Sequence, residues 1–503
     1  MSSTPLHLTV SAEAAAPQIS RHIFGQFAEH LGRCVYEGIW VGENSSIPNV
    51  RGIRSDVVAA LREIQVPNVR WPGGCFADAY HWRDGIGPRA QRPRMMNDTW
   101  GIPETNEFGS LEFIDFCEQV GCEPVICGNV GSGTVQEMRD WLEYLNAPVG
   151  RPLSDLRAAH GRPEPARVRY WGVGNESWGC GGNMRAEYYA DEFRRYATYL
   201  GGYMKEPLHR IGCGPGVDDW HWTEVMMREC GAPRFHPEIM SGLTLHYYMN
   251  GGCPPEFWAT RFDHQGWNHV MAHAWEIDRL VRRHAEIMDK YDAKKRIALI
   301  VDEWGSWYTA EPGSRPNELF QQQTVRDALV AALTLNCFIA HADRVRMANV
   351  AQMINVLHSV ILTYGEKIVL TPSWHVFHLY RPHQNATRLA VTGDIPVSNF
   401  SDMPYPRVSV AASQAADQSI TVTLAHTDPA EPLAISLAIP GLPGGVTATG
   451  RIITAPELTA CNTPEQPNRV TARDWSSFSL LGHTLTTTLP PACVASVTFS
   501  SRK

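Results

Sequence analysis

Short apolar runs alternate with helical patterns through the larger part of this chain. Each run ends at Gly, Pro or polar residues, which is typical of buried strands in a parallel sheet. The runs lie at residues 24–29, 69–71, 124–128, 168–173, 210–213, 243–246, 297–301 and 345–348. Between them apolar residues recur at helical spacing, and we expect helices at 56–64, 111–120, 135–145, 186–200, 269–291, 324–340 and 374–379. Eight strand–helix units over about 360 residues predict a (β/α)8 barrel with insertions.

The pattern changes at about residue 385. Helical spacing gives way to alternating polar and apolar residues, punctuated by Gly and Pro, at 407–412, 419–425, 434–439, 484–489 and 495–500. Such spacing predicts an antiparallel β-sandwich, jelly-roll-like in form. A lone strand at residues 6–10 has no place in an eight-stranded barrel, so we expect it to join the sandwich. The predicted domains are a catalytic barrel at 18–384 and a sandwich made of 1–17 and 385–503.

The composition of the chain limits the classes of partner and substrate that it could bind. The 503 residues carry a net charge of -8 with no run of Lys or Arg, which argues against nucleic acid or an anionic membrane as partner. Sixteen Trp residues favour carbohydrate, because sugar rings stack on aromatic platforms. The N-terminus has no signal-peptide pattern and no apolar run approaches ~18 residues, so we expect a cytoplasmic protein without a membrane span. The twelve Cys form no CxxC pair, which predicts mostly buried, reduced thiols rather than disulfides.

Polar side chains follow several of the predicted barrel strands. Strands of such a barrel direct their carboxyl ends to one shared mouth, where chemistry is done. The residues at these ends are Glu29, Asn129, Asn175, Glu176, His246, Tyr248, Glu303 and Gln352. Four of them have an ordinary alternative: Glu176 could cap the next helix, Glu29 could form a salt bridge, His246 could be a core histidine, and Asn129 is expected to bond loop backbone.

Two of these residues, Glu176 after the fourth strand and Glu303 after the seventh, would face each other across the mouth. Paired carboxylates can cleave a glycosidic bond, one protonating the leaving oxygen while the other attacks the anomeric carbon. Their pKa values must then differ. A separation of about 5–5.5 Å gives retention and about 6.5–9.5 Å gives inversion. Glu176, beside a glycine-rich loop, suits the proton donor, and Glu303, backed by an apolar strand and near Tyr248, suits the nucleophile.

Seven motifs together resemble the α-L-arabinofuranosidases of glycoside hydrolase family 51, a clan A family. They run in order from the first barrel strand to the eighth: FAEHLG at 27–32, RWPGG at 70–74, GNVGSGT at 128–134, GVGNE at 172–176, HYY at 246–248, DEW at 302–304 and NVAQMINVL at 349–357. The resemblance implies a barrel with a C-terminal sandwich, Glu176 as acid/base, Glu303 as nucleophile, and retention by double displacement.

The resemblance also implies the substrate contacts. Glu29, Asn175 and Gln352 would bind arabinofuranose hydroxyls, His246 and Tyr248 would orient the carboxylates, and Trp100 and Trp307 would form aromatic walls. Arg70 would be a buried charge partner. The expected substrates are arabinoxylan or arabinan oligosaccharides with terminal non-reducing arabinose, and the expected assembly is a homo-oligomer, a hexamer in this family. Many members have Asn where this chain has Cys75, and a thiol donates weakly, so one sugar contact is expected to weaken.

Other functions stay open at this stage. A β-glucanase or β-xylosidase could use the same scaffold, and the sandwich could act as a non-catalytic carbohydrate-binding module. No metal and no cofactor are expected: Cys34, Cys75 and Cys180 lack further ligands at metal spacing, and the glycines at 128–134 lack a phosphate-binding lysine. Trp40 and Trp82 are expected to serve packing alone.

Overall fold

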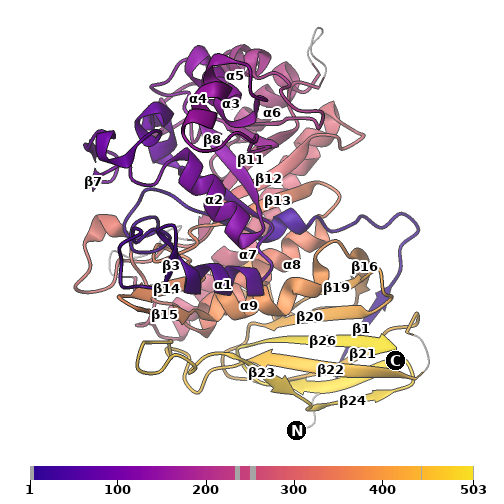
Figure 1. The fold of residues 1–503 in the computed structure, drawn as a ribbon. Helices are drawn as coiled ribbons and strands as arrows, with labels where there is room; N and C mark the ends of the chain where they lie inside the picture. The colour runs from indigo at the N-terminus through magenta and orange to yellow at the C-terminus, as the bar shows by residue number, and fades with distance from the viewer. Residues whose placement is uncertain (1–4, 233–237, 250–256, 443–444, 502–503) are drawn as a thin grey trace.

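The computed structural model describes residues 5–232, 238–249, 257–442 and 445–501. Figure 1 shows a barrel surrounded by helices, with a large antiparallel sheet packed below it. Both predicted layers of the fold are therefore present. The domain boundaries at residues 17/18 and 384/385 stay a prediction.

Eight parallel strands close the barrel, in the order β10-β11-β12-β13-β2-β5-β8-β9. Every one of them falls on an expected run, so the (β/α)8 prediction is confirmed. Their bounds are β2 (Gly25–Phe27), β5 (Asn68–Trp71), β8 (Glu123–Gly128), β9 (Tyr170–Val173), β10 (His209–Gly212), β11 (Gly242–Met249), β12 (Ala298–Ser306) and β13 (Val345–Val350). The strands β11 and β12 run several residues further than expected, because their polar residues continue the parallel pairing beyond the apolar run.

Helices cover the outside of the barrel. Local signals set their ends: the Thr134 hydroxyl caps α3, and Gly121, with φ of 82°, ends α2 in the left-handed region that glycine favours. Two helices, α4 and α6, were not expected from apolar spacing. The bounds are α1 (Ser55–Glu63), α2 (Ser110–Val120), α3 (Val135–Asn146), α4 (Pro152–Ala159), α5 (Ala186–Tyr199), α6 (Trp220–Cys230), α7 (His264–Tyr291), α8 (Val325–Ala340) and α9 (Pro372–Tyr380).

Ten strands form the second layer, in the order β23-β22-β26-β20-β19-β16-β1-β21-β25-β24. Strand β1 (Leu6–Ser11) pairs antiparallel with β16 and parallel with β21, which confirms that the N-terminal strand joins this sheet. Its Leu8 and Val10 alternate into the sandwich core. The other bounds are β16 (Thr387–Thr392), β19 (Val408–Gln414), β20 (Ile420–His426), β21 (Leu433–Ala438), β22 (Val446–Ile453), β23 (Ala472–Trp475), β24 (Phe478–Leu481), β25 (Thr484–Leu489) and β26 (Cys493–Ser501).

Within the described residues, four small two-stranded sheets lie in the loops. They are β3 (Asn49–Val50) with β4 (Ile53–Arg54), β6 (Met95–Asn97) with β7 (Ile102–Glu104), β14 (Ile361–Tyr364) with β15 (Lys367–Leu370), and β17 (Val397–Phe400) with β18 (Met403–Pro406). The second of them lies in the Trp-rich loop that follows β5.

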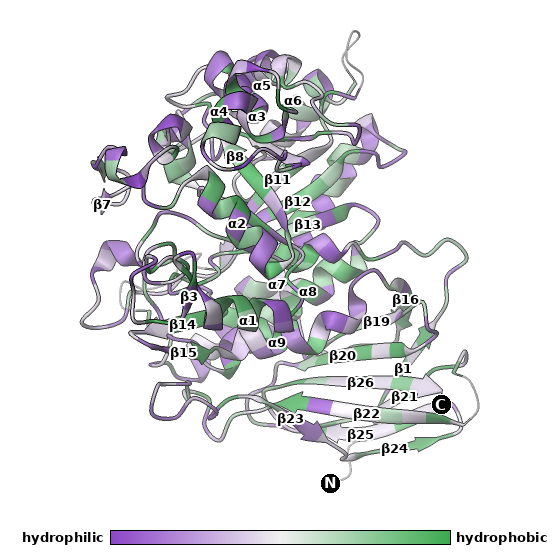
Figure 2. Ribbon diagram, in the orientation of Figure 1, coloured by the Kyte–Doolittle hydropathy of each residue, from purple (hydrophilic) through white to green (hydrophobic). Residues whose placement is uncertain are grey.

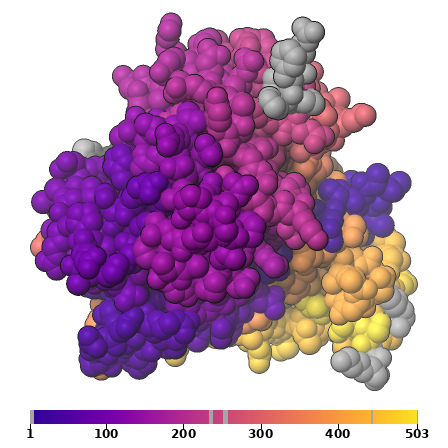
Figure 3. Space-filling model, turned by 45° about the horizontal axis from the view of Figure 1, so that its top comes forward, coloured from indigo at the N-terminus to yellow at the C-terminus, as the bar shows by residue number. Residues whose placement is uncertain are grey.

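Helices α8 and α9 lie between the barrel and the sheet, and Figure 2 shows apolar segments on both sides of this junction. Helix α8 is buried from Val325 to Ile339 and contacts β12 on one side and β19, β20 and β26 on the other. Its Asn336 donates to the Ser409 hydroxyl and accepts from Thr423. Figure 3 shows the indigo N-terminal segment beside orange and yellow C-terminal residues. None of the described helices is long and apolar enough to cross a membrane.

Candidate active site

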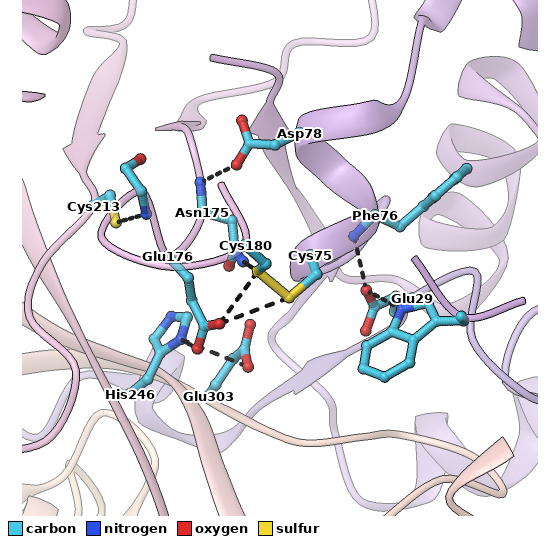
Figure 4. The surroundings of a disulfide bond; sticks show 12 residues. Glu29, Cys75, Phe76, Asp78, Asn175, Glu176, Cys180, Cys213, His246 and Glu303 are labelled. Atoms are coloured by element: carbon cyan, nitrogen blue, oxygen red, sulfur yellow. Dashed lines mark hydrogen bonds and ion pairs between the residues drawn. A yellow bond between two sulfur atoms is a disulfide. The ribbon is translucent and has the colours of Figure 1, made fainter. Parts of the chain in front are cut away.

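The carboxylate of Glu303 lies at the centre of the barrel mouth (Figure 4). Glu303 lies within β12 rather than after it, and the parallel register pairs it with His246 of β11. Its Oε1 accepts from Arg70 Nη1 at 2.9 Å and its Oε2 accepts from the Tyr248 hydroxyl at 2.8 Å. Burial raises the pKa of Glu303, while the positive charges of His246 and Arg70 act in the opposite sense. These donors fix both oxygens in place.

Arg70 connects three elements beneath the site. Besides Glu303, its guanidinium contacts Asp302 Oδ2 at 3.0 Å and donates to Asn175 Oδ1 at 2.5 Å, and it lies over the Phe27 ring. The side chain is 3% exposed. A buried cation with two carboxylate partners is held in its charged form. The expected role of Arg70 as a buried charge partner therefore agrees with its contacts.

His246 connects the two candidate catalytic carboxylates. Its Nδ1 lies 2.9 Å from Glu176 Oε1 and 3.6 Å from Glu303 Oε2, and its Nε2 lies 3.1 Å from Asp302 Oδ1. Burial lowers the pKa of His246, but the charges of Glu303 and Asp302 outweigh it and raise that pKa to about 10. The imidazole is thus positively charged at neutral pH, and both of its nitrogens donate.

Glu176 approaches Glu303 from the loop after β9. One carboxylate oxygen of Glu176 lies within 4.8 Å of one carboxylate oxygen of Glu303, and a nitrogen of His246 lies within the same distance of both. The Glu176 side chain is 19% exposed, whereas that of Glu303 is 7% exposed. The Glu176 backbone has φ of 41°, a conformation that non-glycine residues adopt at a cost of about 1–3 kcal/mol. The two predicted carboxylates therefore meet, one facing solvent and one enclosed.

Cys75 forms a disulfide with Cys180, and this corrects two expectations. The Cα atoms are 5.5 Å apart and the bond joins the loop after β5 to the loop after β9 (Figure 4). Cys75 is thus no thiol donor to a sugar, and the expectation of reduced thiols rather than disulfides is wrong for this pair. Because disulfide sulfurs carry no proton, they only contact Glu176 Oε2, at 3.7 and 3.4 Å. Nothing in the sequence predicts that cysteines 105 positions apart form a disulfide. The bond is possible because the two loops meet in the folded structure.

A third glutamate carboxylate, that of Glu29, lies on the other side of the mouth (Figure 4). Its Oε1 accepts from Trp100 Nε1 at 3.0 Å and from the Phe76 backbone N–H at 3.1 Å. Its Oε2 accepts from Gln352 Nε2 at 2.8 Å. Burial, followed by repulsion from Glu303, raises the pKa of Glu29 to about 7. Glu29, Trp100 and Gln352 thus form one connected group.

The glycines of the RWPGG motif allow both carboxylates to approach the backbone. A Cβ on Gly73 would lie 2.6 Å from Glu29 Cγ, and one on Gly74 would lie 2.8 Å from Glu303 Oε1. Both distances are shorter than real contacts. Only glycine fits here while Glu29 and Glu303 keep their positions.

Two aspartates that the sequence did not single out complete the site. Asp302 contacts both Arg70 and His246. Asp78 accepts backbone N–H bonds from Val130, Gly131 and Asn175 at 2.6–2.8 Å. Burial raises the pKa of Asp78 to about 6. Asp302 is part of the DEW motif, in which only its neighbour Glu303 was predicted to be catalytic. Nothing in the sequence indicates the role of Asp78, because its partners lie in two distant loops.

The remaining predicted residues divide into walls and scaffold. Trp307 meets Tyr248 edge-to-face, with ring centroids 5.1 Å apart, and both are partly exposed. Asn129 bonds loop backbone at Tyr80, Ser132 and Gly133, as expected for a structural residue. Trp40 and Trp82 are buried.

Three ligand-type side chains, Glu176, His246 and Glu303, come close enough to hold a metal ion. Two of the three already have several protein partners: His246 contacts Glu176 and Asp302, and Glu303 accepts from Arg70 and Tyr248. The donor set fits a network of proton donors and carboxylates. A closed (β/α)8 barrel with two carboxylates facing each other at its mouth defines a glycoside hydrolase of the paired-carboxylate type.

Comparison with known proteins identifies the family. Residues 302–493 match the model of the α-L-arabinofuranosidase C-terminal domain, and residues 60–211 match that of the α-L-arabinofuranosidase 1 domain. An intracellular exo-α-L-arabinofuranosidase of Bacteroides ovatus is 44% identical over 97% of this chain and 95% of its own. The chain belongs to the α-L-arabinofuranosidases of glycoside hydrolase family 51, and the predicted enzyme class is confirmed.

Solved structures agree. The family 51 arabinofuranosidase of Xanthomonas axonopodis pv. citri is 46% identical, covers 99% of this chain and 100% of its own, and superposes with a TM-score of 0.95. An α-L-arabinofuranosidase of Thermotoga maritima, solved as an arabinose complex, is 29% identical and has a TM-score of 0.86. The match covers 98% of this chain and 99% of the Thermotoga chain.

Proposed function

We propose that this arabinofuranosidase removes terminal non-reducing α-L-arabinofuranosyl residues by retaining double displacement. The observation that carries the proposal is the pair of carboxylate oxygens, one from Glu176 and one from Glu303, within 4.8 Å of each other. A retaining mechanism needs carboxylates about 5–5.5 Å apart, because both act directly on one glycosidic bond. An inverting enzyme needs a wider gap for its water.

Glu303 is the nucleophile in this proposal. Its carboxylate attacks the anomeric carbon while the carboxylic acid of Glu176 gives its proton to the leaving oxygen, so one C–O bond forms as another breaks. The ionised Glu176 then takes a proton from water, and the resulting hydroxide displaces Glu303 from the sugar. The Tyr248 and Arg70 contacts support the assignment, since they aim the Glu303 oxygens, and the greater exposure of Glu176 gives water a path to it.

The arabinose ring is proposed to bind between these carboxylates and the group formed by Glu29, Trp100 and Gln352. A protonated Glu29 can donate to a hydroxyl, and the amides of Asn175 and Gln352 offer further polar contacts. Trp307 and Tyr248 form an aromatic edge for the sugar or its leaving group. The disulfide takes the place of the hydrogen-bond donor expected at Cys75. The exo mode is supported by the name of the Bacteroides relative.

The proposed substrates are arabinan- or arabinoxylan-type oligosaccharides, hydrolysed in the cytoplasm. The Bacteroides relative, named intracellular, supports the location. A homo-oligomer, with the hexamer implied by the family, is the proposed assembly, and light scattering on the purified chain tests it.

The mechanism is tested by following hydrolysis of 4-nitrophenyl α-L-arabinofuranoside by proton NMR. The expected first product is the α-anomer of arabinose, which later mutarotates. If the β-anomer appears first, the double displacement is wrong although the activity stands. Parallel assays with 4-nitrophenyl β-xyloside and soluble β-glucan complete the test, because faster turnover of either would contradict the substrate class.

A further inference from the structure

Three side chains of ligand type meet on the outside of the barrel, on the helices α7 and α8 that flank β12 in the chain. Asp278 projects from α7, Cys337 from α8, and His341 follows the last turn of α8. Asp278 Oδ1 lies 3.0 Å from His341 Nε2 and 3.9 Å from Cys337 Sγ. One ligand atom of each residue lies within 4.8 Å of the other two.

We propose that Asp278, Cys337 and His341 bind a zinc ion that ties α7 to α8. Tetrahedral zinc, with bonds of about 2.0–2.3 Å, holds its ligand atoms roughly 3.3–3.6 Å from one another. The two measured distances, 3.0 and 3.9 Å, lie on either side of that spacing and within about 0.6 Å of it. Carboxylate, thiolate and imidazole together suit zinc better than the hard cations magnesium or calcium, which take oxygen ligands.

The helix geometry prepares this arrangement. Cys337 and His341 are four residues apart, which places them on one face of α8. They stand at the carboxyl end of the helix, where the helix dipole favours a cation. Cys337 is buried, whereas the side chains of Asp278 and His341 are 27% and 23% exposed. An ion can therefore enter past the carboxylate and the imidazole, and a water molecule can complete the coordination.

Binding follows a simple balance. Zinc replaces the proton on the Cys337 thiol, and this proton is released to solvent. The hydrogen bond between His341 and Asp278 is lost, and each of the two side chains binds the metal instead. Helix α8 runs antiparallel to the barrel strands, and β13 begins at Val345 soon after His341. The site thus lies at the end of the barrel opposite to the mouth, and its effect is on stability rather than on the reaction.

Cobalt(II) provides the test, since a thiolate ligand gives it a near-ultraviolet charge-transfer band that carboxylates and imidazoles cannot give. The full chain, stripped with a chelator and kept free of thiol reductant, is expected to show this band at one equivalent of cobalt. Zinc should abolish the band and raise the thermal midpoint. The Glu176, His246 and Glu303 cluster contains no thiol, so cobalt bound there is silent in this band.

Variants decide which residues bind. His341→Ala and Asp278→Asn, both at partly exposed positions, are each expected to weaken zinc binding at least about 10–100-fold, since loss even of an outer-shell partner costs that much. Cys337→Ser should remove the band. The matched control is Cys122→Ser, which alters a free thiol elsewhere in the chain, partly rather than fully buried, and should leave the band intact. The absence of a band in the unaltered chain, its persistence in Cys337→Ser, or its loss in Cys122→Ser would overturn the proposal.

Discussion

Nδ1 of His246 lies 2.9 Å from Oε1 of Glu176, while the same nitrogen is 3.6 Å from Glu303. A single imidazolium thus contacts both carboxylates on which the proposed mechanism depends. Asp302 holds its other nitrogen and so fixes the plane of the ring. The charge of His246 is set by these acids, because burial alone would remove it.

Replacing His246 by Asn is expected to lower kcat by about 10²-fold with little change in KM, because the two carboxylates lose their common donor and shift. Steady-state kinetics on the nitrophenyl arabinofuranoside measures this. Since the pKa of His246 is raised to about 10, the imidazole stays charged from pH 5 to 8 and adds no limb to the unaltered enzyme's pH profile. If kcat/KM falls by the same factor because KM rises while kcat is unchanged, His246 serves substrate binding instead.

The two glutamates should respond differently to truncation. Glu303→Ala is expected to lose more than about 10⁴-fold on every substrate, as removal of a nucleophile does elsewhere. Glu176→Ala is expected to lose about 10²–10⁴-fold on substrates with poor leaving groups and far less on activated ones, because these need no proton. Azide supplies the readout: it should restore Glu176→Ala with a retained glycosyl azide and Glu303→Ala with an inverted one. The reverse pattern of azide products would exchange the two roles.

The Cys75–Cys180 disulfide holds the loop of Glu176 against the loop after β5. The double variant Cys75→Ser/Cys180→Ser is expected to lose about 2–4 kcal/mol of unfolding free energy, because the bond closes a long loop. It should also lose kcat, since Glu176 is less restrained. Urea unfolding and kinetics measure both, with Cys122→Ser as the control.

Redox conditions offer a second view of the same bond. If the bond positions Glu176, the enzyme with an intact disulfide should be faster than the same enzyme with the bond reduced. Dithiothreitol should slow the unaltered enzyme and leave the double variant unchanged. Equal rates for the oxidised and reduced unaltered enzyme would show that the bond does not position Glu176.

Glu29 should make stability depend on pH. Its pKa rises from 4.5 in the unfolded chain to about 7 when buried, so the folded state holds the proton more tightly. The resulting stabilisation is fully present below about pH 4.5 and is lost as pH rises through about 7, a change of about 3 kcal/mol. In Glu29→Gln this contribution is absent. Between pH 4.5 and 8 the thermal midpoint of the unaltered protein should therefore fall relative to that of Glu29→Gln. If the two thermal midpoints change with pH in parallel, the raised pKa of Glu29 is contradicted.

The sequence alone determined the barrel, the sandwich, the positions of Glu29 and Glu176 just beyond strand ends and that of Glu303 on the seventh strand. Those inferences rest on local periodicity and on the rule that parallel strands share one mouth, both readable from neighbouring residues. Tertiary structure alone decided the contacts of Asp78, the second role of Asp302 and the bond between Cys75 and Cys180. Each depends on loops that meet in space although they are far apart along the chain. Composition and spacing carry no information about such meetings, because the distance between two loop residues is fixed only when the barrel closes.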